Sequence, residues 1–139
     1  MSLSPQQVEL VQSTFRVVQP MSSTAGKLFY GKLFQIDPPL EDLFTGDLEQ
    51  QGQKFMQILA VAVGSLTNLP MLVPIVQQLG VRHASYGVTQ EHYDTARDAL
   101  MWTLAMVLQD RYTDEVRSAW VSAYAMLAGI MKEAAWGKP

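Results

Sequence analysis

Apolar residues recur at intervals of three and four along almost the whole chain, and this periodicity constrains the fold more than any other feature. In the first such stretch the apolar positions are Val8, Val11, Phe15 and Val18. This spacing places apolar side chains on one face of an α-helix. No segment shows the two-residue alternation of a half-buried strand. The sequence therefore predicts an all-α fold of about six helical segments.

Capping and helix-breaking residues divide this pattern. Ser4, Pro5 and Gln7 combine a capping serine, a proline at the first helical position and a glutamine three residues after the cap. Further helices are expected from Ser22–Ser23, from Leu48 to Leu66, over Met71–Arg82, from Thr89 and from Thr113, with breaks at Pro20, Pro38–Pro39 and Asn68–Pro70. We expect the last two helices, which a short loop joins, to pack as an antiparallel pair.

Length and composition limit the class of protein. The 139 residues suffice for one domain, 1–139, with a buried core. The net charge of −3 argues against nucleic acid as a main partner, because phosphate binding needs clustered basic residues. The absence of cysteine excludes disulfides and thiolate metal sites and suits a cytoplasmic protein. The N-terminal residues do not resemble a signal peptide, and the longest apolar region, Ile58–Leu66, is too short to span a bilayer.

The chain has only two histidines, His83 and His92. They lie nine residues apart with Gly87 between them, so they cannot be paired metal ligands on one helix face. Motifs for phosphate binding, zinc proteolysis, serine hydrolysis and calcium binding are missing. A lone histidine near a helix end can cap the helix or pack in the core. It can also be the single protein ligand that haem iron needs on one side, and the residues alone leave both roles open for His83.

A series of short motifs resembles one family when it is taken in order. Phe44 follows two prolines in PPLEDLF, Gln51 follows early in the next helix, and His83 comes 32 residues later. Further matches are LFYGKLF around Tyr30, NLP at 68–70, RHASYGV at 82–88, HY at 92–93 and AWVSAY at 119–124. Over nearly its whole length the chain resembles the globins, specifically bacterial single-domain haemoglobins similar to the haem domain of flavohaemoglobins. The resemblance implies a globin fold around haem b (iron protoporphyrin IX).

The resemblance also implies a role for each matched residue. His83 corresponds to the proximal ligand of the iron, and Phe44 to the phenylalanine that packs against the porphyrin. Tyr30 and Gln51 correspond to the two distal residues that face a bound gas. A phenol or amide donor at these positions stabilises bound oxygen, which carries partial negative charge. The resemblance further places these residues at the haem: Phe55 distally, Tyr93 proximally and Val88 after the histidine. Arg82 and Lys54 flank the expected proximal and distal residues, so they are candidate partners of the haem propionates.

Several of these residues could have a different role. Gln50 and Gln53 belong to the same run of glutamines as Gln51, so either could take the distal position instead. Purely structural roles also remain open: core packing for Tyr30, Phe44 and Phe55, solvated surface charge for Arg82 and Lys54, and polar helix surface for His92.

One position departs from the family pattern. In flavohaemoglobins a glutamate late in the last helix joins the tyrosine and the proximal histidine, and it makes the imidazole more anionic. Ala135 occupies that position here, and Glu133, two residues earlier, points about 200° away around the helix. We therefore expect the imidazole N–H of His83 to donate to a backbone carbonyl one turn back, near Leu79.

Two glycines flank His83. Gly80 is expected to let the helix loosen or approach the porphyrin closely, and Gly87 to end the segment.

These expectations favour a haem-binding globin that binds oxygen, carbon monoxide and nitric oxide reversibly, as in oxygen transport. One alternative is a nitric oxide dioxygenase that depends on a separate reductase, because no reductase region follows before Pro139. Another is a haem-free, globin-like regulatory module.

Overall fold

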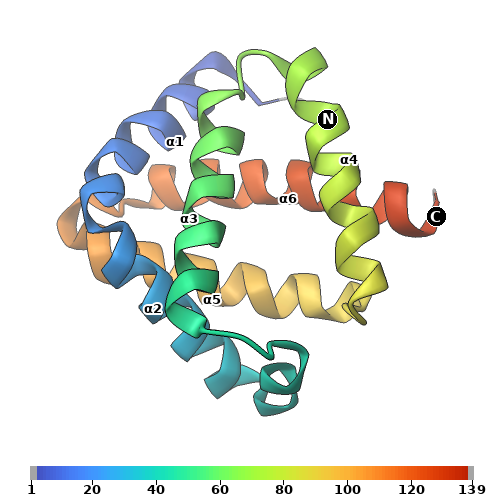
Figure 1. Cartoon of the computed structure of the whole chain (residues 1–139). Coiled ribbons are helices and arrows are strands. Elements are labelled where there is room, and N and C mark those ends of the chain that lie inside the picture. The colour runs from blue at the N-terminus through green and yellow to red at the C-terminus, as the bar shows by residue number, and fades with distance from the viewer. Residues whose placement is uncertain (1–2, 138–139) are drawn as a thin grey trace.

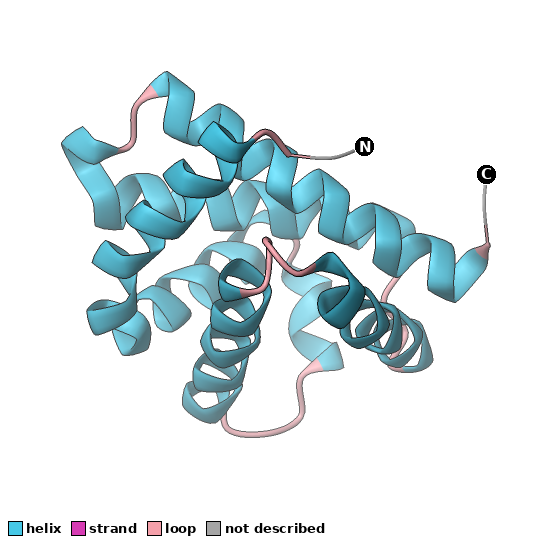
Figure 2. Cartoon of the chain, turned by 90° about the horizontal axis from the view of Figure 1, so that it is seen from above, coloured by secondary structure: helices cyan, strands magenta, loops and turns pink. Residues whose placement is uncertain are grey.

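The computed structural model describes residues 3–137, which fold entirely into helices and connecting loops (Figures 1 and 2). The all-α prediction is therefore confirmed. The α-helices of this part of the chain are α1 (Pro5–Val18), α2 (Ser22–Ile36), α3 (Leu48–Gly64), α4 (Leu69–Ser85), α5 (Gln90–Leu108) and α6 (Asp114–Trp136). Three short 3-10 helices connect some of them: η1 (Gln19–Met21), η2 (Pro38–Leu43) and η3 (Gln109–Arg111).

The predicted helix starts are found where the capping residues lie. Ser4 Oγ accepts the backbone N–H of Gln7 at 3.0 Å, and Gln7 Oε1 accepts the N–H of Ser4 at 3.0 Å. This reciprocal box satisfies two amide donors that the first turn of α1 leaves without helical partners. Thr113 accepts the N–H of Val116 in the same way at the start of α6.

Helix α4 is longer than predicted, since it extends over Leu69–Ser85 and not only over Met71–Arg82. Pro70 lies in the first turn of α4, where a missing N–H is harmless, so it starts this helix and does not only end the previous one. Pro74 lies inside the helix and removes one hydrogen bond near its start. The extension places His83 inside the last turn of α4.

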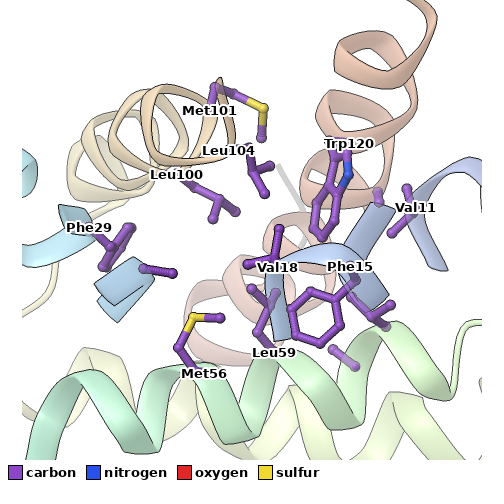
Figure 3. Close-up of a cluster of buried hydrophobic side chains, with 14 of the residues drawn as sticks. Val11, Phe15, Val18, Phe29, Met56, Leu59, Leu100, Met101, Leu104 and Trp120 are labelled. Atoms are coloured by element: carbon purple, nitrogen blue, oxygen red, sulfur yellow. The ribbon is translucent and has the colours of Figure 1, made fainter. Parts of the chain in front are cut away.

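The core is built by side chains from all six α-helices, and Figure 3 shows part of this cluster. Trp120 of α6 lies against Phe15 of α1, with ring centroids 6.2 Å apart. The Nε1–H of Trp120 donates to Thr14 Oγ1 at 2.9 Å, which joins α6 to α1 inside the core. Leu104 of α5 is buried in the same cluster. Helices α5 and α6 run in opposite directions, as predicted (Figure 1).

Helices α3 and α4, which carry Gln51 and His83, pack against different partner helices. Helix α3 packs most extensively against α2, whereas α4 packs most extensively against α6. Gly26 and Gly52 form the α2–α3 crossing, and Gly80 meets the backbone of Met131 at the α4–α6 crossing. A methyl group at Gly80 would lie 2.6 Å from the Met131 Cα. Gly80 is therefore needed for a helix crossing, which corrects the expectation that it serves an approach to a porphyrin.

No helix among the described residues is long and apolar enough to cross a membrane.

Candidate functional site

An aromatic cluster forms where α2, α3 and the end of η2 meet. The ring of Tyr30 lies 5.2 Å from that of Phe44 and 6.2 Å from that of Phe55, both in edge-on orientation. Phe29 stacks on Phe55 with centroids 4.1 Å apart and planes 6° from parallel. The structure thus brings three of the sequence-predicted residues together. Phe29 was not predicted as part of the site, although it directly precedes Tyr30 in the LFYGKLF motif.

Tyr30 is the polar member of this cluster. Burial raises the pKa of its phenol, and a side-chain hydrogen bond with Gln51 acts in the opposite direction. This hydrogen bond joins Tyr30 of α2 to Gln51 of α3. Gln51 is half-buried, whereas Gln50 and Gln53 are exposed, so Gln51 is the glutamine of the run that reaches Tyr30.

His83 lies in the last turn of α4 with its side chain half-buried. Its Nδ1 is 2.7 Å from the backbone carbonyl oxygen of Leu79, so the predicted hydrogen bond is confirmed. A carbonyl oxygen only accepts, and the proton must therefore be on Nδ1. In the neutral ring Nε2 then carries a lone pair, and its direction is set by the Leu79 contact.

The backbone of His83 is also fixed, by the turn that ends α4. The N–H of Val88 donates to the His83 carbonyl at 3.1 Å, and the N–H of Gly87 donates to the Ala84 carbonyl at 3.1 Å. These two bonds form a Schellman motif, which requires a left-handed residue after the helix. Gly87 supplies it with φ +95°. The prediction that Gly87 ends the segment is confirmed, and Val88 contacts His83 through the backbone.

Tyr93, near the start of α5, is buried, and its hydroxyl has no hydrogen-bond partner within the described structure. Burial raises the pKa of this phenol to about 12. The ammonium group of Lys132 lies 5.4 Å from the centroid of the Tyr93 ring, and the ring centroid of Trp136 lies 6.1 Å away in an edge-on orientation. Tyr124 donates its hydroxyl to the Tyr93 carbonyl at 2.7 Å. A buried hydroxyl without a partner is uncommon, and it fits a protein that holds a further polar group at this point.

The remaining predicted residues lie on the surface or serve the helices. Arg82 and Lys54 are exposed, and neither forms an ion pair with another described residue. His92 accepts the Thr89 N–H on Nδ1 at 3.0 Å, and its Nε2 lies 4.0 Å from Asp37 Oδ2. His92 therefore caps α5, consistent with the role of a polar residue at a helix start.

Two residues late in α6, Glu133 and Ala135, concern the expected partner of the His83 imidazole. Glu133 is exposed, and Ala135 is half-buried.

A separate surface cleft of about 410 Å³ is lined by Arg97, Asp98, Met101, Arg117 and Val121 and contains none of the predicted site residues.

The donor set of the site suits a cofactor that brings most ligands of its own metal. Residues 3–137 contain no group of three or more His, Cys, Asp and Glu side chains placed to hold a metal ion. His83 offers one imidazole nitrogen in a fixed tautomer, which is what haem iron takes from a protein on its proximal side. The aromatic cluster and the unpartnered Tyr93 hydroxyl fit a planar, mainly apolar group with polar edges. The residues present therefore fit haem.

Comparisons with known proteins show the family to which the chain belongs. The sequence profile of the globin family, described as "Globin", matches residues 27–131. The chain is 32% identical to a flavohemoprotein of Bordetella parapertussis over 133 residues, or 93% of this chain and 33% of that protein. It is 29% identical to the flavohemoprotein of Bacillus subtilis, with 91% and 33% covered. The chain thus spans about a third of the length of these relatives.

A solved structure shows the same fold. The hexacoordinated heme protein from an anhydrobiotic tardigrade superposes with a TM-score of 0.88 at 18% sequence identity, covering 96% of this chain and 95% of that one. The expected globin fold is therefore confirmed.

Proposed function

Because the chain belongs to the globin family, we propose that it binds haem b through Nε2 of His83 and takes up oxygen, carbon monoxide and nitric oxide reversibly. Globin membership implies haem binding. The assignment of His83 as the iron ligand, and of reversible gas binding as the role, goes beyond what globin membership implies. The observation that supports it most is the 2.7 Å hydrogen bond from His83 Nδ1 to the Leu79 carbonyl, which leaves Nε2 as the ligand atom.

The residues around the site have complementary tasks in this proposal. Haem iron supplies the binding position for a diatomic gas. The rings of Phe44 and Phe55 exclude water, and a dry pocket strengthens every hydrogen bond inside it. The Tyr30 hydroxyl would donate a hydrogen bond to a bound gas, and the side-chain hydrogen bond with Gln51 would hold Tyr30 in place. This donor favours oxygen, which becomes partly negative, over carbon monoxide, which stays nearly apolar.

On the proximal side, the acceptor of the imidazole proton decides between gas binding and oxygen activation. A neutral carbonyl pulls less strongly on the Nδ1 proton than a carboxylate does, so the imidazole of His83 gains less anionic character. This favours reversible binding over dioxygenation of nitric oxide. Turnover with an added reductase tests the dioxygenase alternative directly.

Absorbance of the purified protein tests the proposal. We expect a Soret band after haem is added, with shifts when the iron is reduced and when carbon monoxide is supplied. His83→Ala should weaken haem retention by at least about tenfold, since the protein ligand is lost. His92→Gln is the matched control, because glutamine at this position preserves the cap of α5.

Two results would count against the proposal. A wild-type protein that takes up no haem would support the haem-free regulatory alternative. Equal haem retention in His83→Ala and wild type would show that His83 is not the ligand.

A further inference from the structure

The backbones of Gly26 in α2 and Gly52 in α3 face each other at close range. A methyl group at Gly26 would lie 3.0 Å from the Cα, carbonyl carbon and carbonyl oxygen of Gly52. In the reverse direction, a methyl group at Gly52 would lie 3.3 Å from the Cα and carbonyl carbon of Gly26. Both glycines are buried. Backbone atoms cannot rotate away as side-chain ends can, so any larger residue must push the helices apart.

The residues one helical turn after this crossing form the aromatic cluster. Phe29 and Phe55 each come three residues after one of the glycines, and their rings stack at 4.1 Å. Tyr30 comes four residues after Gly26, so it projects from the same side of α2. The distance between the helices is thus transmitted within one turn to the side chains that the proposed function uses.

Gln51 is directly bonded to Gly52 in the chain, and its side chain is hydrogen-bonded to Tyr30 of the opposite helix. This hydrogen bond spans the α2–α3 interface beside the crossing. A hydrogen bond weakens steeply when its two partners separate by a few tenths of an ångström beyond normal length. The Tyr30–Gln51 hydrogen bond is therefore sensitive to a change in the separation of α2 and α3.

We propose that Gly26 and Gly52 are positioning residues for gas selectivity: their contact sets the helix separation at which Gln51 holds Tyr30 for donation to oxygen. The proposal rests on the proposed function, because it concerns the same pocket. Neither glycine touches the gas. Each acts through Tyr30, and the selectivity of the pocket depends on two residues that carry no side chain.

The experiment compares haem-loaded wild type with three Gly→Ala variants. Gly26→Ala meets three backbone atoms at 3.0 Å and should raise the oxygen dissociation rate about tenfold, as expected for loss of one hydrogen bond to a charged acceptor. Gly52→Ala meets its neighbours at 3.3 Å and should raise this rate only about threefold. Carbon monoxide dissociation should change by less than about twofold in both variants.

Gly31→Ala is the matched control on the same helix. Gly31 is exposed on α2, and a methyl group there meets nothing within 4 Å. It should leave both dissociation rates at the wild-type value. The graded order of Gly26→Ala, Gly52→Ala and Gly31→Ala follows from the contact distances, so a different order would overturn the proposal.

Combining each variant with Tyr30→Phe separates positioning from general loosening. If the glycines act through Tyr30, Gly52→Ala should add no further increase in oxygen dissociation when the phenol is already absent. An equal increase in both backgrounds would show that the crossing affects the pocket by another route and would overturn the proposal.

A spectroscopic measurement gives a readout that does not depend on gas release. The side-chain amide resonances of Gln51 should shift in Gly52→Ala and stay in place in Gly31→Ala, in haem-free and in haem-loaded protein. Because Gly52→Ala needs only a small displacement, it decides the matter even if Gly26→Ala does not fold. A wild type without haem uptake would contradict the proposed function, whereas haem and oxygen binding with unchanged Gly→Ala variants would contradict this inference alone.

Discussion

The buried hydroxyl of Tyr93 is expected to lower the stability of the haem-free protein. The hydroxyl has no partner within residues 3–137, and an unsatisfied buried hydroxyl lowers stability by about 1–3 kcal/mol. We expect Tyr93→Phe to raise the free energy of unfolding of haem-free protein by about 1 kcal/mol at neutral pH. Urea denaturation measures this. Tyr86→Phe, at a side chain that is 67% exposed, is the control and should change little.

The same phenol makes stability depend on alkaline pH. The pKa of Tyr93 is about 12 in the folded protein, against an ordinary value of 10.0, so the folded state holds this proton more tightly. The stability linked to that proton is complete below pH 10 and is lost as the pH rises toward 12. Tyr93→Phe should therefore flatten the fall in stability over this range, and an equally steep fall would contradict the assignment.

At this scale, sequence reasoning succeeds where an interaction is local. The bond from His83 to Leu79 joins residues four apart on one helix, so the sequence is enough to predict it. The choice of Gln51 over its neighbours depends on how α3 faces α2, and the run of glutamines carries no information about that. The unpartnered hydroxyl of Tyr93 likewise depends on contacts with α6.

Among the elements, the turn after α4 is the one on which the placement of His83 depends most. Gly87 has φ +95°, a conformation that costs a residue with a side chain about 1–2 kcal/mol. Gly87→Ala should reduce stability by about this amount, disturb the bond from Val88 to His83, and weaken haem retention. Thermal unfolding and Soret absorbance measure the two effects.

Gly46→Ala serves as the control for Gly87→Ala. Gly46 lies in the loop before α3, where a methyl group meets nothing within 4 Å and φ is not positive. It should leave stability and haem retention unchanged. Haem retention equal in Gly87→Ala and Gly46→Ala would show that the turn does not hold the site.

Helix starts were predictable because capping depends on residues next to each other. Ser4 and Thr113 cap the helices that the sequence assigns to them. The start of α4 was not, because Pro70 is compatible with two roles: a proline ends one helix and is equally suited to the first turn of the next. The spacing of apolar residues does not separate these cases.

Across the whole molecule, the hydrogen bond from Trp120 to Thr14 joins residues 106 apart in sequence. Thr14→Val would keep the shape of the side chain and leave the indole N–H without its partner in the core. We expect a loss of about 1–3 kcal/mol in the free energy of unfolding, measured by urea denaturation. Thr103→Val is the matched control, because the buried Thr103 hydroxyl donates only to Ala99 of its own helix.

The Thr103→Val control should cost less than about 1 kcal/mol. Neither variant should change the absorbance of haem-loaded protein, since both threonines lie outside the proposed site. Equal destabilisation by the two substitutions would show that the link between α1 and α6 contributes nothing of its own.

Apart from the antiparallel α5–α6 pair, which its short loop predicts, the arrangement of the helices was accessible only through the family resemblance. Periodicity identifies which face of a helix is apolar, and it does not say which other helix covers that face. The contacts of Gly26 with Gly52, and of Gly80 with Met131, join segments far apart in the sequence and leave no local pattern. The sequence therefore predicts the parts of the fold, while their crossings require the structure.

The separate support of α3 by α2 and of α4 by α6 has a consequence for how such a protein can evolve. The residues assigned to gas discrimination belong to the first pair of helices, and the residue assigned to holding the cofactor belongs to the second. A lineage can therefore retune its gas affinity through one pair while inheriting its cofactor attachment unaltered through the other.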